Sequence, residues 1–367
     1  MAGGSSRPLD TLAPASAGGY SVGPASHRRY RGRMLTPPDG LSEELLGAAL
    51  YRHWNVVASS MSYLAVGFGS HHWEVADPGG TRWFVTADEL HNKRVRLSES
   101  LDTAFGRLRA ALSAAMDLRA SGRSFVVAPV PAAGGEPLVR AGAEFGVAVY
   151  PFVAGTSFEW GEFSSPAHRD AVLDLLIAVH TAPRGAARRA MTDDFVVPHR
   201  DELEAAIDSA GRTEADPAGP FTRPAASLLA ANRAPIRRLL ARYDELAARA
   251  RSQPARAVLT HGEPHPGNTM LTADGWRLID WDTVLVAPPE RDLWSLDHAD
   301  GSVLARYGAA TGVRPLSPVL ELYRLRWDLA DIAVDASRFR RPHRGSADDE
   351  ASWELLRSLV ERVAADD

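Results

Sequence analysis

The feature that most constrains this chain of 367 residues is a polar loop between two short apolar runs. The runs 257–260 and 276–279 have the length and composition of β-strands, and the loop between them carries Glu263 and Asn268. Another carboxylate, Asp280, directly follows the second run. Phosphoryl transfer needs a carboxylate that orients the attacking hydroxyl and oxygen ligands that hold Mg²⁺. The segment therefore favours a phosphoryl-transfer site built where a loop meets the end of a strand.

Hydrophobic periodicity divides the rest of the chain into a β-rich first part and a helical second part. In the first part the patterns predict helices at 41–57 and 101–116, and strands at 63–66, up to 75, 82–86, 124–130, 137–139 and 147–152. In the second part they predict helices at 166–181, 199–209, 224–250, 317–336 and 350–364, with a polar loop at 211–220. The first three strands, separated by turns, predict an antiparallel meander.

This order predicts an α+β enzyme with two lobes and a cleft between them. Residues 1–33 are rich in Gly, Ser, Ala, Pro and Arg, so we expect a disordered tail there. We expect residues 34–152 to form a small β lobe that binds a nucleotide. Residues 153–367 would form a larger helical lobe with the catalytic loop, the metal site and the acceptor pocket.

Composition argues against several other classes of protein. The chain has no cysteine, which excludes disulfides, a thiol nucleophile and a cysteine-ligated zinc site. Its formal net charge of −5 argues against general nucleic-acid binding. We find neither a membrane-length apolar run nor the apolar core of a signal peptide, and therefore expect a cytoplasmic protein without a nucleic-acid or membrane partner. The sequence carries no signal for an oligomeric state.

The segment around the polar loop resembles the aminoglycoside-phosphotransferase and related small-molecule kinases. That family carries His-Gly-Asp-x-His-x-x-Asn followed by Ile-Asp-Trp or Ile-Asp-Phe. The positions that match are His261, Gly262, His265, Asn268, Ile279, Asp280, Trp281 and Asp292. The resemblance implies a protein-kinase-like fold and transfer of phosphate from ATP or GTP to a small hydroxyl compound, an antibiotic above all. A sugar or amino alcohol is the alternative acceptor.

The resemblance also assigns roles within the segment. Glu263, Asn268 and Asp280 would form the catalytic set, with Asn268 and Asp280 as the Mg²⁺ ligands. The residues expected to support the loop are His261, His265 and Asp292. Zinc ligation by the two histidines is disfavoured, because the prolines beside His265 oppose the helix that a zinc protease motif needs.

One departure concerns the base. The family has aspartate where this chain has Glu263, and the extra methylene moves the carboxylate by about 1–1.5 Å. A displacement of that size costs roughly a hundredfold in rate unless the loop compensates. A loop built around glutamate can compensate, so catalysis is expected, and a kinase-like nucleotide-binding protein without catalysis is the rival hypothesis.

A second departure concerns the phosphate-binding lysine. The family carries it on the third strand, where this chain has Thr86, and the helix 101–116 lacks the glutamate that would pair with it. Lys93 is the only lysine of the chain. It either swings back over the cleft or remains a solvated turn residue. Arg82 and Arg94 are the other cations near this point.

Nucleotide contacts are expected in a Gly-rich turn after the first strand and in the hinge 149–155. Backbone amides of the turn, and either of its histidines, would face phosphate, while the hinge backbone would bind the purine. The expected nucleotide-binding residues are Gly67, Gly69, Ser70, His71, His72, Tyr150 and Phe152.

The resemblance places the acceptor on the helical lobe above the catalytic loop. The candidate residues are Asp282, Trp294, Trp327, Asp328 and Asp331. The acidic side chains suit a polycationic acceptor such as an aminoglycoside, whereas the tryptophans suit a sugar or nucleobase. Local pairing of Arg324 with Asp328 is the structural alternative. Asp282 is also a candidate ligand of a second metal ion.

Overall fold

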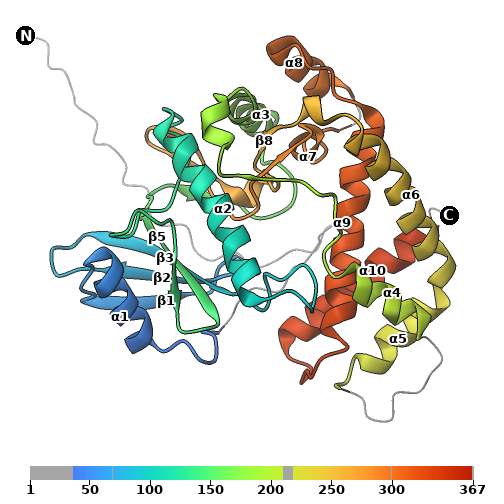
Figure 1. Ribbon diagram of the computed structural model, residues 1–367, viewed down its shortest axis with the longest axis horizontal. Helices are drawn as coiled ribbons and strands as arrows, with labels where there is room; N and C mark the ends of the chain where they lie inside the picture. Colours follow the sequence, from blue (N-terminus) through green and yellow to red (C-terminus); the bar gives the residue numbers. More distant parts are fainter. Residues whose placement is uncertain (1–35, 68, 210–217, 299, 366–367) are drawn as a thin grey trace, which may run out of the picture.

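The computed structural model describes residues 36–67, 69–209, 218–298 and 300–365. The tail expected over 1–33 and most of the polar loop expected over 211–220 lie outside these residues. Figure 1 shows a small β lobe at the left and a larger helical lobe at the right. The predicted two-lobed α+β architecture is therefore confirmed.

The β lobe contains an antiparallel sheet with the strand order β1-β2-β3-β5-β4. Its strands are β1 (Ser60–Leu64), β2 (His71–Ala76), β3 (Arg82–Glu89), β4 (Val139–Ala141) and β5 (Phe145–Pro151). Val85 and Ala87 of β3 are buried in an apolar layer shared with α1 (Glu43–Trp54). Because side chains alternate along a strand, Thr86 and Asp88 face the other side of the sheet, toward the cleft. The predicted meander is confirmed.

Helix α2 (Leu101–Ala120) joins the two lobes (Figure 1). Its Leu108 and Leu112 belong to one buried cluster that also contains Ala148 of β5 and, from the helical lobe, Leu278 and Trp281. Trp281 lies in the sequence between two carboxylates that follow β10, Asp280 and Asp282. We call this cluster the apolar seam between the lobes. It fixes the sheet of the β lobe relative to the segment 280–282.

The helical lobe is built around α9, which packs against α4, α6, α7 and α10. Its helices are α3 (Pro166–His180), α4 (Arg200–Asp208), α5 (Thr222–Ala231), α6 (Arg233–Arg251), α7 (Glu290–Leu293), α8 (Ser302–Thr311), α9 (Ser317–Arg338) and α10 (Ala347–Ala365). Its short strands form two sheets, β10-β9-β6 and β7-β11-β8. These strands are β6 (Thr156–Ser157), β7 (Met191–Thr192), β8 (Val258–Thr260), β9 (Thr269–Thr272), β10 (Gly275–Leu278) and β11 (Leu285–Ala287). Among the helices that the structure describes, none combines the length and apolarity that a membrane-spanning segment requires.

Two predicted elements were wrong, both because of proline. The strand expected at 124–130 makes only an isolated bridge, from Val126 to Leu278, since Pro129 and the proline after Val130 cannot donate to a ladder. The helix expected at 224–250 is divided into α5 and α6 at Asn232. Pro235 lacks the N–H that would donate to the carbonyl of Ala231, and Asn232 Nδ2 caps the end of α5 by donating to the carbonyl of Leu228 at 2.9 Å.

The apolar seam between the lobes can be tested with Leu112→Ala. Leu112 is 1% exposed, so its truncation should lower the free energy of unfolding by about 2–5 kcal/mol, measured by urea denaturation. The control is Leu97→Ala, the same chemical change at a side chain that is 49% exposed, which should stay within about 0.5 kcal/mol of the parent. Equal losses in the two variants would contradict the seam.

Candidate functional site

Asp292 of α7 holds the loop between β8 and β9 in place through hydrogen bonds. Its Oδ2 accepts a hydrogen bond from the backbone N–H of His261 at 2.8 Å, and its Oδ1 accepts one from Gly262 at 2.6 Å. His180 Nε2 of α3 lies 3.0 Å from Oδ2. Burial alone would raise the pKa of Asp292, but the hydrogen bond and charge of His180 outweigh it and lower the pKa. The loop is therefore anchored to two helices through one ionised carboxylate.

His261 connects the loop to the end of β10. Its Nε2 donates to the carbonyl of Ile279 at 2.9 Å, and its Nδ1 accepts the backbone N–H of Glu263 at 3.2 Å. This pair of bonds assigns the proton to Nε2. Burial lowers the pKa of His261, which keeps the ring neutral as the two bonds require. The ring also packs edge-on against Trp281, with centroids 4.6 Å apart.

Gly262 is required by two constraints at the same position. Its φ of +104° lies in the region that favours glycine. A Cβ atom there would also stand 2.6 Å from the guanidinium carbon of Arg291. That guanidinium donates to Thr260 Oγ1 at 2.9 Å and to the carbonyl of Thr283 at 2.7 Å, so it cannot move aside without losing both bonds.

Glu263, Asn268 and Asp280 are brought to one point of the cleft. Asn268 Nδ2 donates to the carbonyl of Glu263 at 2.9 Å, and the backbone N–H of Ile279 donates to the carbonyl of Asn268 at 3.0 Å. Asp280 itself has φ +63°, a left-handed conformation that aspartate tolerates better than most residues. Asp280 is exposed as a residue, but the protein packed around its carboxylate first, and then the negative charges of Asp282 and Glu263, raise its pKa well above the usual value. The carboxylates of Glu263, Asp280 and Asp282 therefore lie close to one another.

The donor set of this space fits Mg²⁺. The amide nitrogen of Asn268 is bound to the loop, so its side-chain oxygen is the atom that can ligate a cation, beside the carboxylate of Asp280. Within the described ranges, no group of three His, Cys, Asp or Glu side chains has the geometry of a complete metal cage. Mg²⁺ does not need one, since it commonly takes one or two carboxylates together with phosphates and waters.

The Gly-rich turn between β1 and β2 lies over the carboxylates. Gly67 and Gly69 have φ of +68° and +75°, conformations that favour glycine. Ser70 Oγ donates to Asp88 Oδ1 at 2.5 Å, which ties the turn to β3. Binding of phosphate by the backbone of this turn stays a prediction.

The two histidines after the turn bond to protein groups, and a contact of either with phosphate stays a prediction. The ring of His71 is buried and bonds the hydroxyl of Tyr63 at 3.0 Å and the carboxylate of Glu89 at 3.1 Å. His72 Nδ1 donates to the carbonyl of Val66 at 2.9 Å. Burial, the largest cause, lowers the pKa of His72 to about 4, so its ring is neutral at pH 7.

Lys93 reaches into the cleft, so it is not a solvated turn residue. Its Nζ lies 2.7 Å from Asp282 Oδ2, 2.9 Å from Asp88 Oδ1 and 3.4 Å from Ser70 Oγ. Burial would lower the pKa of Lys93, but the two carboxylates outweigh it and raise the pKa well above the usual value. Arg94 points away, since it donates to backbone carbonyls of its own loop at 3.2 Å and 3.0 Å.

The hinge residues divide between the cleft and the rim. Tyr150 lies on the cleft side of the sheet, where burial first and then the charge of Asp88 raise the pKa of its hydroxyl well above the usual value. Phe152 lies at the rim, and the guanidinium of Arg82 stacks 3.6 Å above its ring. Arg82 also pairs with Glu74 at 2.6 Å, so its guanidinium does not point into the cleft.

The acceptor candidates on α9 are largely buried and do not form an exposed acidic face. Asp328 is 8% exposed and pairs with Arg362 of α10 at 2.9 Å, whereas the sequence suggested Arg324. The ring centroids of Trp294 and Trp327 are 5.6 Å apart. The remaining candidates are Asp331, which is buried, and Asp282, which pairs with Lys93 as described above. Their contact with an acceptor stays a prediction.

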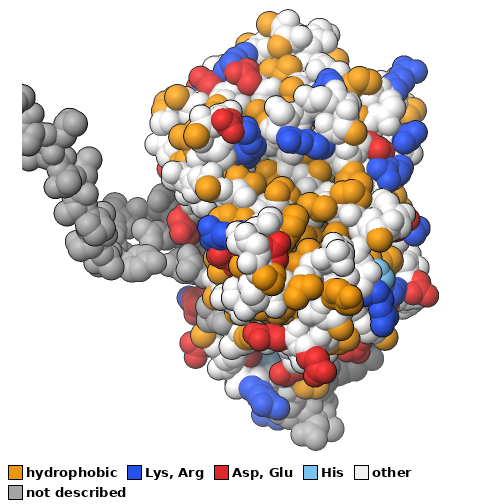
Figure 2. Space-filling model, turned by 90° about the vertical axis from the view of Figure 1, so that its left-hand side faces the viewer, with side chains coloured by type: hydrophobic (Ala, Val, Ile, Leu, Met, Phe, Trp, Pro, Cys, Tyr) orange, Lys and Arg blue, Asp and Glu red, His pale blue; other side chains and the backbone are white. Residues whose placement is uncertain are grey.

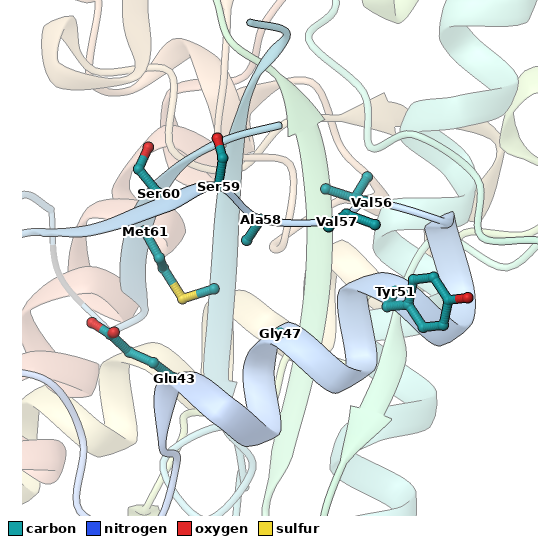
Figure 3. A pocket seen from close by; sticks show the side chains of 9 residues that line it. All are labelled: Glu43, Gly47, Tyr51, Val56, Val57, Ala58, Ser59, Ser60 and Met61. Atoms are coloured by element: carbon teal, nitrogen blue, oxygen red, sulfur yellow. The ribbon is translucent and has the colours of Figure 1, made fainter. Parts of the chain in front are cut away.

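A hollow on the β lobe lies away from this chemistry. Figure 3 shows it between α1 and the segment that leads into β1, with Gly47 and Tyr51 on one side and Val57 and Met61 on the other. It is on the α1 side of the sheet, whereas Asp88 faces the cleft. Figure 2, which faces the side where the β lobe lies, shows apolar side chains gathered across its middle.

Asp88, His180 and Arg291 are residues of the site that were not predicted. For Lys93 the sequence left two directions open, over the cleft or into solvent, and the fold of the loop after β3 decides between them. His180 of α3 and Arg291 of α7 contact residues that hold the loop between β8 and β9. These contacts join residues far apart in the chain, so the sequence alone does not show them. For Arg291 the sequence offered one signal, its position next to Asp292. A residue beside Asp292 also lies close to the loop between β8 and β9.

Comparison with known proteins identifies sequences and structures that are similar to most of this chain. The sequence model of the phosphotransferase enzyme family (APH) matches residues 67–361. Protein StrN of Streptomyces griseus is 35% identical over 263 residues, which cover 68% of this chain and 76% of that protein. The solved structure of spectinomycin phosphotransferase APH(9)-Ia with ADP and spectinomycin has a TM-score of 0.66 at 16% identity, covering 89% of this chain and 99% of that chain. A microcompartment-associated aminopropanol kinase has a TM-score of 0.54 at 15% identity, covering 89% and 98%. The two structures show that the fold is shared.

The two constraints on Gly262 can be separated by a matched control. Gly262→Ala adds backbone strain and a clash with Arg291, and should lower the free energy of unfolding by about 2–5 kcal/mol. Gly275→Ala has nearly the same φ, +102°, with no atom within 4 Å of the added carbon, so it should cost only about 1–2 kcal/mol. Urea denaturation followed by circular dichroism measures both. A loss for Gly262→Ala no larger than that for Gly275→Ala would refute the role of Arg291.

Proposed function

Because the chain belongs to the phosphotransferase enzyme family, we propose that it transfers the γ-phosphate of ATP or GTP to a hydroxyl group of an antibiotic, as a resistance enzyme. Family membership makes it a small-molecule phosphotransferase with a hydroxyl acceptor. The donor nucleotide, the metal ion and the antibiotic belong to the proposal. The observation that carries it is the meeting of Glu263, Asn268, Asp280 and Lys93 in one cleft.

In the proposed mechanism, Glu263 accepts a hydrogen bond from the acceptor hydroxyl and takes its proton as the oxygen attacks phosphorus. The backbone of Glu263 is held at both ends, by the ring of His261 and by the amide of Asn268, so the carboxylate projects from a rigid loop. This rigidity matters because loose phosphoryl transfer depends mainly on positioning. The loop is thus suited to a glutamate base in spite of the extra methylene.

Asn268 and Asp280 would hold Mg²⁺, which neutralises the charge of the transferring phosphate when it is bound. Asp280 is suited to this role because desolvation, and then the charges of Asp282 and Glu263, raise its pKa, so a cation nearby would stabilise its ionised form. His261 and Asp292 keep the loop that carries Asn268 next to the strand end that carries Asp280. In this proposal they position the ligands and do not touch the substrate.

An antibiotic acceptor is supported by the fold shared with spectinomycin phosphotransferase along almost the whole of that protein. An amicoumacin kinase in complex with AMP-PNP, Ca²⁺ and amicoumacin has a TM-score of 0.54 and covers 89% of this chain and 94% of that chain. The aminopropanol kinase supports a second candidate, an amino alcohol of primary metabolism. A shared fold does not decide between them, so the acceptor must be identified by experiment.

The catalytic set predicts different losses for two variants. Glu263→Ala should lower kcat by about 10²–10⁴-fold and leave the affinity for Mg-nucleotide within about twofold, because the base acts only on the hydroxyl. Asp280→Ala should abolish turnover and also weaken Mg-nucleotide binding by at least about tenfold, because a metal ligand is lost. Steady-state kinetics and isothermal titration calorimetry measure the two effects.

Asp274→Ala is the control, since the side chain of Asp274 is 87% exposed on the turn between β9 and β10. It should behave as the parent in both assays. A parent protein that binds Mg-nucleotide but turns over no acceptor would favour the rival hypothesis of a non-catalytic binder. In that case Glu263→Ala would change nothing that can be measured.

The acceptor proposal predicts that one or more hydroxylated antibiotics gain the mass of a single phosphate group in the presence of protein, Mg²⁺ and either ATP or GTP. Mass spectrometry of a panel of aminocyclitols, aminoglycosides, nucleoside antibiotics, sugars and amino alcohols provides the measurement. Phosphorylation of an amino alcohol alone would replace the antibiotic by the second candidate. Glu263→Ala protein serves as the blank for the panel.

A further inference from the structure

Lys93 is the only lysine of the chain, and its amine is enclosed by three elements of the cleft. Asp88 belongs to β3, Ser70 to the Gly-rich turn, and Asp282 to the turn that follows Asp280, and each has an oxygen within 3.4 Å of Lys93 Nζ. A Cβ atom built on Gly69 would stand 3.9 Å from the same Nζ. The amine therefore lies directly beneath the turn that would cover the phosphates.

The backbone of Lys93 is held as firmly as its side chain. Arg107 of α2 donates to the carbonyl of Lys93 at 2.9 Å and forms an ion pair with Glu99. Glu99 in turn accepts the backbone N–H of Val95 at 2.7 Å, and the carbonyl of Val95 accepts the N–H of His199 at 2.8 Å. The loop after β3 is thus fixed to α2 and to the helical lobe with its lysine directed inward.

The two carboxylates that hold the amine differ in exposure. The side chain of Asp88 is 4% exposed and also accepts the hydroxyl of Ser70, whereas that of Asp282 is 21% exposed. An ammonium group has three donors, so it can keep Asp88 and exchange its other partner for a phosphate oxygen. Asp282, once released, lies two residues from Asp280 and can assist in holding the cation.

This inference rests on the proposed function and concerns the same site. We propose that Lys93 binds the phosphates of the donor nucleotide from the loop after β3, with Asp88 as its permanent anchor and Asp282 as the partner that phosphate displaces. The lysine that relatives carry on the third strand is then replaced by a lysine from the following loop, and the paired glutamate of the helix by an aspartate of the strand. Arg107 acts as a positioning residue, through the backbone of Lys93.

Calorimetry with two kinds of ligand tests the contact with phosphate. Lys93→Met should weaken binding of Mg-AMP-PNP or Mg-GMP-PNP, whichever the parent binds, by at least about tenfold, because a charged hydrogen bond is lost. Its affinity for adenosine or guanosine should stay within about twofold of the parent. Arg96→Met is the matched control, since Arg96 is a 53% exposed cation of the same loop, and it should bind all four ligands as the parent does.

Unchanged binding of the triphosphate analogues by Lys93→Met, or equal losses for nucleoside and triphosphate, would overturn the contact. Asp282→Asn tests the exchange separately. Removing the resting partner should tighten binding of metal-free ADP or GDP in EDTA, because less competition remains for the amine. Unchanged or weaker binding there would overturn the role of Asp282.

A measurement on the parent protein covers the case in which Lys93→Met does not fold. Protein labelled with ¹³C at the lysine ε-carbon contains one labelled residue. Its single NMR signal should shift on saturation with the Mg-triphosphate analogue and stay in place with the nucleoside. A signal that does not respond to the bound analogue overturns the inference. A parent that binds no nucleotide removes the proposed function as well, whereas a parent that turns over while Lys93→Met binds normally removes only this inference.

Discussion

The carboxylate of Asp292 accepts hydrogen bonds from two consecutive backbone N–H groups of the catalytic loop and bonds His180 of another helix. A buried carboxylate is costly unless its oxygens are satisfied, so loop and helices are kept together by the same interaction that pays for the burial. Glu263 follows directly in the chain, and its own N–H binds the ring of His261. The position of the proposed base therefore depends on the hydrogen bonds that Asp292 accepts from the neighbouring residues of the loop.

Carboxylates outnumber cations among the described side chains that line the cleft. Asp88 and Asp282 hold the single lysine of the chain, and the pKa of Asp280 is raised by desolvation first and then by the charges of Asp282 and Glu263. A metal ion bound to a polyphosphate would bring positive charge to Asp280 and negative charge to Lys93. The arrangement of charges is thus complementary to a metal–nucleotide complex, which explains why four carboxylates are tolerated in one partly buried space.

Much of the fold could be predicted because its elements follow local patterns. Alternating apolar runs separated by turns identified β1 to β3, and the apolar stripe of 101–116 identified α2. The two wrong predictions also have local causes, because prolines interrupt the strand predicted at 124–130 and the helix predicted at 224–250. The small strands β6, β7 and β11 were not predicted, since such short segments become strands only when a neighbour in space supplies the ladder.

By itself, the sequence determined which chemical groups the loop and the following strand carry. Spacing along the chain was enough to predict that Glu263, Asn268 and Asp280 lie close together, because each lies in or next to a segment that a strand and two prolines hold stiffly. Only the tertiary structure decided the direction of the long side chains. Lys93 and Asp282 are 189 residues apart, and His71 and His72 turn to partners that no local pattern shows. A flexible side chain takes its direction from the partners that folding brings within its reach, and those contacts are not encoded in spacing.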